Sequence, residues 1–163
     1  MKKVLFTLAI IAFASCSSNE TSTSSADTLN CKDSACCDST SVDSLVKSVE
    51  AACIDADLLI FSDFNYGCLP QNVVNELTAI AEAKKIRVVA DSQSSSQIGD
   101  ISRFKNVDLI TPTEREARIA LRNTGDGLVV IAQQVCERAN AKSVTLKLGE
   151  QGVLLHGRWG KDW

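Results

Sequence analysis

Short apolar segments alternate with amphipathic segments along the chain after residue 55, and this alternation constrains the fold more than any other feature. Predicted strands, each a short apolar run, cover 56–64, 86–91, 107–111, 143–149 and 152–157. Predicted helices, whose apolar residues recur at helical spacing, cover 70–85, 112–122 and 127–140. Strand–helix–strand alternation predicts an α/β fold with a doubly wound, mostly parallel sheet and helices on both faces.

Capping chemistry places the helix starts. Thr111 with Pro112 and Glu114 fits an N-cap, a first-turn proline and an acidic third position, and Thr113 with Glu116 fits a capping box two residues later. Asp126 is positioned to cap the helix at 127–140. Local physics therefore favours a helix start over a chemical site for the segment around residue 113.

The N-terminus has the pattern of a secretory signal. Lys2 and Lys3 precede an apolar run, and Ala14 and Ser15 form a small-residue site before Cys16. A cysteine at that position resembles a bacterial lipobox, which predicts a signal peptide at 1–16 and a membrane-anchored lipoprotein lipidated at Cys16. An uncleaved apolar N-terminus is the alternative.

Residues 17–44 are rich in Ser, Thr and Asp and predict a disordered tether before a folded domain at 45–163, because such a composition buries little apolar surface. The tether contains Cys31, Cys36 and Cys37, for which metal binding and exposed or disulfide-linked thiols both remain open.

The composition of the chain excludes several classes of function. The net charge is −3 and aromatic residues make up 5% of the chain, so the sequence does not predict nucleic-acid binding. His156 is the one histidine, which removes Ser/His/Asp and Cys/His nucleophile systems and most zinc sites.

Polar and glycine residues follow the predicted strands. In a parallel sheet the carboxyl ends of the strands share one edge, where ligands gather. The residues at these ends are Ser62, Asp63, Asn65, Gly67, Asp91, Ser92, Gln93, Lys147 and Gly149. The Ser- and Gln-rich segment at 91–104 fits either a phosphate-binding loop or a solvated one.

Four motifs, DLLIFSDFNYG, VVADSQ, LITPTEREA and VTLKLGEQGVLL, occur between residues 53 and 157 in an order that resembles the PfkB (ribokinase-like) carbohydrate kinases. The resemblance is closest to the kinase domain of the bifunctional heptose-phosphate kinase/ADP-heptose synthase. It implies a ribokinase-like fold, ATP and Mg²⁺ as cofactors, and a sugar or sugar phosphate as the second substrate, and it allows a homodimer.

The resemblance also assigns candidate site residues. The Asn-x-x-Glu motif of the family falls on Thr113 to Glu116, with Thr113 in place of the usual Asn. Glu116 would then help to hold hydrated Mg²⁺. Lys147, Gly149 and Gly152 match the nucleotide side of the site, and Asp63 and Asp91 match supporting acids at strand ends.

Two family features are missing from this sequence. The catalytic Gly-Ala-Gly-Asp segment, whose Asp is the general base, is not found, nor is the N-terminal half that carries most sugar contacts. We therefore expect a partial domain without a catalytic base, inactive as written. A non-catalytic lipoprotein with an α/β ligand- or partner-binding module is the alternative.

The sequence contains signals for two different cellular compartments, because the predicted lipoprotein leader favours export and the cysteines do not. Cys53, Cys68 and Cys136 are typical of reduced intracellular thiols, which favours the cytoplasm if the leader is a fusion.

Overall fold

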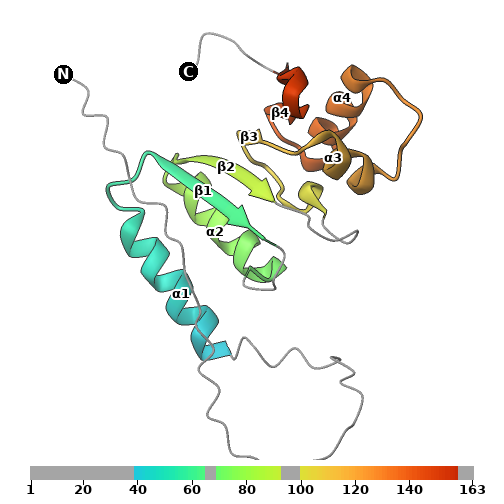
Figure 1. The fold of residues 1–163 in the computed structure, drawn as a ribbon. Coiled ribbons are helices and arrows are strands. Elements are labelled where there is room, and N and C mark those ends of the chain that lie inside the picture. Colours follow the sequence, from blue (N-terminus) through green and yellow to red (C-terminus); the bar gives the residue numbers. More distant parts are fainter. Residues whose placement is uncertain (1–38, 65–68, 93–99, 158–163) are drawn as a thin grey trace, which may run out of the picture.

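The computed structural model describes residues 39–64, 69–92 and 100–157 (Figure 1). The helices are α1 (Ser39–Ala52), α2 (Gln71–Ala83), α3 (Glu114–Leu121) and α4 (Leu128–Ala139), with short 3₁₀ turns at Ile101–Arg103 and Gly149–Gln151. The strands are β1 (Leu58–Asp63), β2 (Arg87–Ser92), β3 (Leu109–Ile110), β4 (Ser143–Lys147) and β5 (Val153–Gly157).

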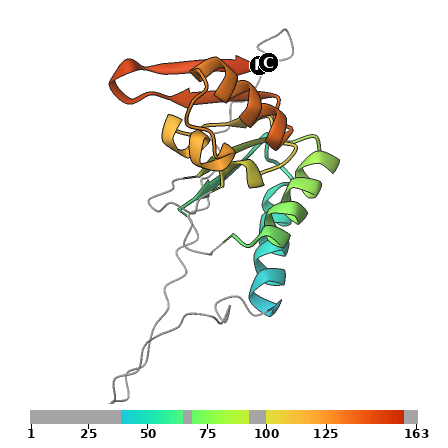
Figure 2. The ribbon, with the colours of Figure 1, turned by 90° about the vertical axis from the view of Figure 1, so that its right-hand side faces the viewer.

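The five strands form one sheet in the order β1-β2-β3-β4-β5. The first four run parallel, and β5 returns antiparallel to β4 through a tight turn. The predicted mostly parallel α/β sheet is therefore confirmed. In the view of Figure 2, the hairpin of β4 and β5 lies at one end of the molecule and α1 at the other.

The described helices cover one face of the sheet. Phe61, Ala90, Ile110 and Val144 stand in register on neighbouring strands and are all nearly inaccessible to solvent. On the opposite face the outer strands expose Leu58, Ile60, Val153 and Leu155. The predicted second helical layer is thus not formed by the described residues. The reason is topological, because parallel strands joined in chain order by right-handed crossovers place their helices on the same side.

Helix α1 packs beside α2 (Figure 1). Val42, Val46, Val49 and Cys53 recur at helical spacing and face the core. Residues 39–44, assigned above to the tether from their composition, are therefore helical. Val42 is the one large apolar residue in this segment, and it packs partly buried against the core.

The starts of α3 and α4 differ from the prediction. Helix α3 uses Thr113 as its N-cap, so the second of the two alternatives is the one formed. Helix α4 begins after Gly127, and Asp126 does not cap it. The carboxylate of Asp126 instead accepts hydrogen bonds from Asn123 and Gln134, which order the loop before α4.

Within the described ranges, no helix has the length and apolarity needed to cross a membrane. Cys16, the rest of the predicted leader and the tether up to residue 38 lie outside the described residues.

Candidate functional site

Three polar side chains meet at the carboxyl edge of the sheet. Asp91 lies on β2, Thr111 follows β3, and Lys147 ends β4. The Asp91 Oδ1 atom accepts a hydrogen bond from Thr111 Oγ1 at 2.8 Å and from Lys147 Nζ at 2.8 Å. The ammonium of Lys147 is thereby held at the strand ends, while about a third of its side chain remains accessible.

The start of α3 is joined directly to the end of β4. Lys147 N donates to Pro112 O at 2.8 Å, and Thr113 pairs with Lys147 as an isolated parallel bridge. The predicted Asn-x-x-Glu equivalent and the predicted nucleotide-side strand therefore lie side by side, at the same edge of the sheet.

Thr113 and Glu116 form a complete capping box. Thr113 Oγ1 accepts from Glu116 N at 3.2 Å, and Glu116 Oε2 accepts from Thr113 N at 2.8 Å. Glu116 is only 6% exposed, so its carboxylate lies against the protein rather than in bulk solvent. The structural role expected from local physics is thus present, and it places a carboxylate at this edge.

Gly149 and Gly152 build the turn between β4 and β5. Both have positive φ, +63° and +90°, a backbone conformation that side chains with a Cβ rarely adopt. Leu148 N donates to Gly152 O at 2.9 Å, which closes the turn. The glycines therefore lie at the predicted edge, and the turn explains why these positions are glycine.

Asp63, at the end of β1, is buried and paired with Arg103. Arg103 Nη2 lies 2.7 Å from Asp63 Oδ2, and Arg103 Nη1 donates to Leu69 O at 3.0 Å. The guanidinium also lies 4.4 Å from the centre of the Phe104 ring. This pair fixes the segment after residue 100 against β1, so Asp63 is a structural residue of the edge.

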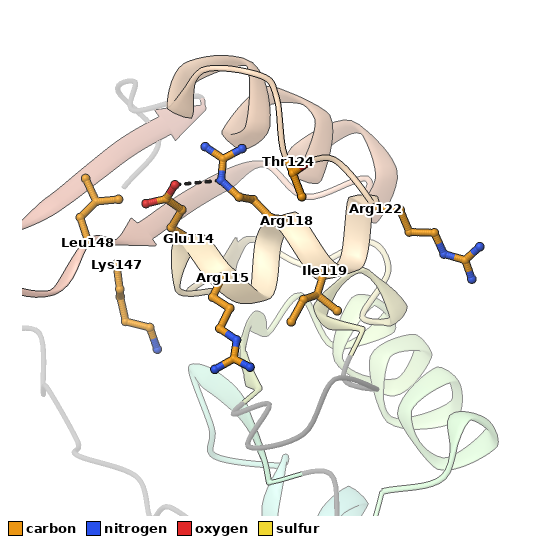
Figure 3. A pocket seen from close by; sticks show the side chains of 8 residues that line it. All are labelled: Glu114, Arg115, Arg118, Ile119, Arg122, Thr124, Lys147 and Leu148. Atoms are coloured by element: carbon orange, nitrogen blue, oxygen red, sulfur yellow. Dashed lines mark hydrogen bonds and ion pairs between the residues drawn. The ribbon is translucent and has the colours of Figure 1, made fainter.

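A cavity of about 860 Å³ opens between the outer face of α3 and the end of β4 (Figure 3). Its lining is strongly cationic, with four basic side chains and one carboxylate. The lining residues are Glu114, Arg115, Arg118, Ile119, Arg122, Thr124, Lys147 and Leu148. In a chain whose net charge is −3, this is a local concentration of positive charge.

Of the predicted site residues, Lys147 lines the cavity. Thr113 and Glu116 lie at the first turn of α3 and are not among the residues that line the cavity, and Glu116 is buried. Sequence reasoning missed Arg115, Arg118 and Arg122, of which the first two lie three residues apart in α3 and the third is its C-cap. Of the segment at 91–104, which was predicted to be a phosphate-binding or a solvated loop, residues 93–99 lie outside the described residues.

The donor set at this edge fits a hydrated magnesium ion better than a metal enclosed by protein ligands. Within the residues that the structure describes, no three His, Cys, Asp or Glu side chains gather as a metal site. Mg²⁺ keeps several waters and is commonly bound through one or two carboxylates together with substrate phosphates. Asp91 and Glu116 supply two carboxylates near the strand ends.

A relative of this chain is the bifunctional protein HldE of Pelobacter propionicus, with 29% identity over 106 residues. The aligned part covers 63% of this chain and 21% of that protein, so the chain spans about a fifth of the relative's length.

Solved structures of similar fold include the phosphofructokinase-2 of Escherichia coli in complex with fructose-6-phosphate. The TM-score is 0.59 at 20% identity, covering 76% of this chain and 41% of that one. The ribokinase of Arabidopsis thaliana complexed with ribose and ATP gives a TM-score of 0.54 at 16% identity, covering 70% of this chain and 36% of that one. These likenesses confirm the ribokinase-like fold.

The sequence pattern of the pfkB family carbohydrate kinases matches residues 21–161. This match begins inside the predicted tether and continues through the described domain, so it spans most of the sequence. The chain belongs to the pfkB family of carbohydrate kinases.

Proposed function

We propose that this chain binds Mg·ATP at the carboxyl edge of its sheet, as the phosphoryl-donor part of a sugar-phosphate kinase. The observation that carries the proposal is the junction between α3 and β4. There the Thr113–Lys147 bridge brings a capped helix start and a strand-end lysine together. Family membership supplies the reaction class, which is transfer of the γ-phosphoryl group of ATP to a sugar hydroxyl.

Each residue at the junction has a distinct task. Lys147, held by Asp91, offers its ammonium to a phosphate oxygen. The capping box uses the N–H groups of Thr113 and Glu116. The first turn of α3 offers a phosphate its remaining N–H groups and the positive end of its dipole. Glu116 and Asp91 would hold the waters around Mg²⁺, which supplies charge neutralisation to the phosphates when bound.

We further propose a heptose-phosphate-like acceptor, on the support of the sequence resemblance and of the HldE relative. The described edge carries no carboxylate that is plainly available as a base. Asp63 is paired with Arg103, Asp91 with Lys147, and Glu116 closes the capping box. The proposal is therefore nucleotide binding by this chain without turnover of its own.

The test is thermal unfolding of the full chain with and without Mg·ATP, alongside ADP release with heptose and ribose phosphates. A ligand at a hundredfold excess over its Kd stabilises the folded state by about 2.7 kcal/mol, which is easily seen in Tm. We expect stabilisation by Mg·ATP and no ADP above background. The charge-removing variant Lys147→Met should lose the stabilisation, whereas Glu150→Gln, in the exposed turn, should keep it.

Absence of stabilisation together with absence of turnover would contradict nucleotide binding and leave a non-catalytic lipoprotein module. ADP release above background would instead contradict the proposed lack of turnover, while supporting the nucleotide site.

We also propose that the chain is anchored to a membrane through lipidation of Cys16, on the support of the lipobox pattern. Metabolic labelling with a radioactive fatty acid tests this directly. We expect label in the wild-type chain and none in the Cys16→Ala variant, and label in neither would contradict the anchor.

A further inference from the structure

Two of the cationic side chains that line the cavity beside α3, Arg118 and Lys147, already have partners within the protein. Arg118 Nε lies 2.8 Å from Glu114 Oε1, and Arg118 Nη1 donates to Asp126 O at 3.0 Å. Lys147 is bound to Asp91. These contacts fix two walls of the cavity, one along α3 and one at the end of β4.

The other two cations, Arg115 and Arg122, are exposed and have no hydrogen-bond or ion-pair partner for their side chains among the residues that the structure describes. An unpaired guanidinium in a concave, cationic setting is well suited to a phosphate, whose oxygens match its planar fork of donors.

The two arginines differ in direction. Figure 3 shows Arg115 and Lys147 projecting the same way, one from the first turn of α3 and one from the end of β4, while Arg122 projects away from both. The Thr113–Lys147 bridge fixes the two backbones that carry Arg115 and Lys147 relative to one another. Arg115 and Lys147 therefore form a pair of cations that project the same way from two joined backbone segments, and Arg122 does not belong to it.

We propose that Arg115 is a phosphate-binding residue, which acts with Lys147 as a two-cation clamp on the polyphosphate chain of a nucleotide. This inference rests on the proposed function for the identity of the nucleotide, but the clamp itself requires only a polyphosphate. The polyphosphate enters from the cavity, and its negative charge is bound by both the guanidinium of Arg115 and the ammonium of Lys147. The free guanidinium loses little by leaving water, because it gains charge-assisted hydrogen bonds.

The experiment measures binding of inorganic tripolyphosphate, ATP with Mg²⁺, and adenosine to the full chain by titration calorimetry. The variant is Arg115→Gln, and two matched controls remove the same charge elsewhere. Arg122→Gln changes the C-cap residue of the same helix, which lines the same cavity, and Arg87→Gln lies at the amino end of β2, at the opposite edge of the sheet. All three arginines are exposed, and the unfolding midpoint of each variant is measured without ligand to show that it is folded.

We expect Arg115→Gln to weaken the binding of tripolyphosphate and of ATP about tenfold, and both controls to change it by less than about twofold. Arg115→Lys should recover part of the loss, because it keeps the charge without the fork of donors. Equal weakening by Arg115→Gln and Arg122→Gln would overturn the clamp in favour of general attraction by the cavity. No effect of either variant would overturn it as well.

The outcomes also separate the clamp from the proposed function. ATP binding that depends on Mg²⁺ but not on Arg115 would contradict the two-cation clamp without contradicting the proposed function. Tripolyphosphate binding that depends on Arg115, with ATP bound no more tightly than tripolyphosphate, would support the clamp and count against a nucleotide site. Binding of neither anion would overturn both.

Discussion

Lys147 reaches across β3 to Asp91, with its Nζ atom 2.8 Å from Asp91 Oδ1, and so ties together the ends of two strands that are not neighbours. Thr111, which follows the intervening strand, donates to the same carboxylate oxygen. One oxygen thus fixes the lysine on which the proposed nucleotide site depends.

The Asp91–Lys147 pair should contribute little to stability. Both side chains are about one-third exposed, and ion pairs of this kind are typically worth 0.2–1 kcal/mol after screening by solvent. We expect a coupling of about 0.5 kcal/mol in a double-mutant cycle of Asp91→Asn and Lys147→Met, measured by urea unfolding. A coupling above about 2 kcal/mol would show that the pair is chiefly structural.

The Asp63–Arg103 pair should matter much more. Asp63 is 4% exposed, and removal of Arg103 leaves its carboxylate buried without that partner. We expect Arg103→Met to lower the free energy of unfolding by about 3 kcal/mol. The control Arg138→Met breaks an exposed pair at 3.7 Å and should cost less than about 0.5 kcal/mol. If both variants lose a similar amount of free energy of unfolding, the burial of the Asp63–Arg103 pair is contradicted.

The cap of α3 can be tested at Thr113. Thr113→Ala removes the acceptor for Glu116 N and should cost about 1 kcal/mol in the free energy of unfolding. Thr113→Asn introduces the residue usual in the family and an equally good cap, so stability should be unchanged or slightly higher. Urea unfolding of the two variants decides, and an alanine variant as stable as the wild type would rule out the capping box.

Stability at alkaline pH should depend on Cys53. Burial raises the pKa of the Cys53 thiol above its ordinary value of 9.0, an effect that nearby Lys84 opposes. Folding therefore favours the protonated thiol, and its contribution is complete below the unfolded pKa and lost as pH rises towards the folded one. Between about pH 8 and 10, Cys53→Ala should lose less stability than the wild type. If the free energies of unfolding of the wild type and of Cys53→Ala, measured with urea, fall equally over this pH range, the expectation is contradicted.

Much of the fold could be predicted from sequence because its strands are short apolar runs. Phe61, Val88 and Ile110 lie in such runs and became the buried face of the sheet. The open face could not be predicted in the same way. Ile60 and Leu155 are as apolar as their buried neighbours, and only the direction of the crossovers decides which face the helices cover.

The cap of α3 could be predicted from sequence, whereas the cationic side chains beside it could not. Capping chemistry located Thr113 and Glu116, because a capping box is a local interaction. Arg115 carries no local signal, since an exposed arginine on a helix is ordinary. Its proximity to Lys147 arises only when β4 is added next to β3, thirty residues further along the chain.

In the proposed function, Glu116 serves a magnesium-bound nucleotide as well as the cap of α3. Glu116→Gln separates the two roles, because glutamine also completes a capping box but lacks the charge. Calorimetric titration of ATP into the full chain, with Mg²⁺ and with EDTA, is the most direct measurement. We predict Mg²⁺-dependent binding by the wild type, and binding by Glu116→Gln that no longer responds to Mg²⁺ while its Tm stays close to that of the wild type. An equal response to Mg²⁺ in both proteins would contradict the claim.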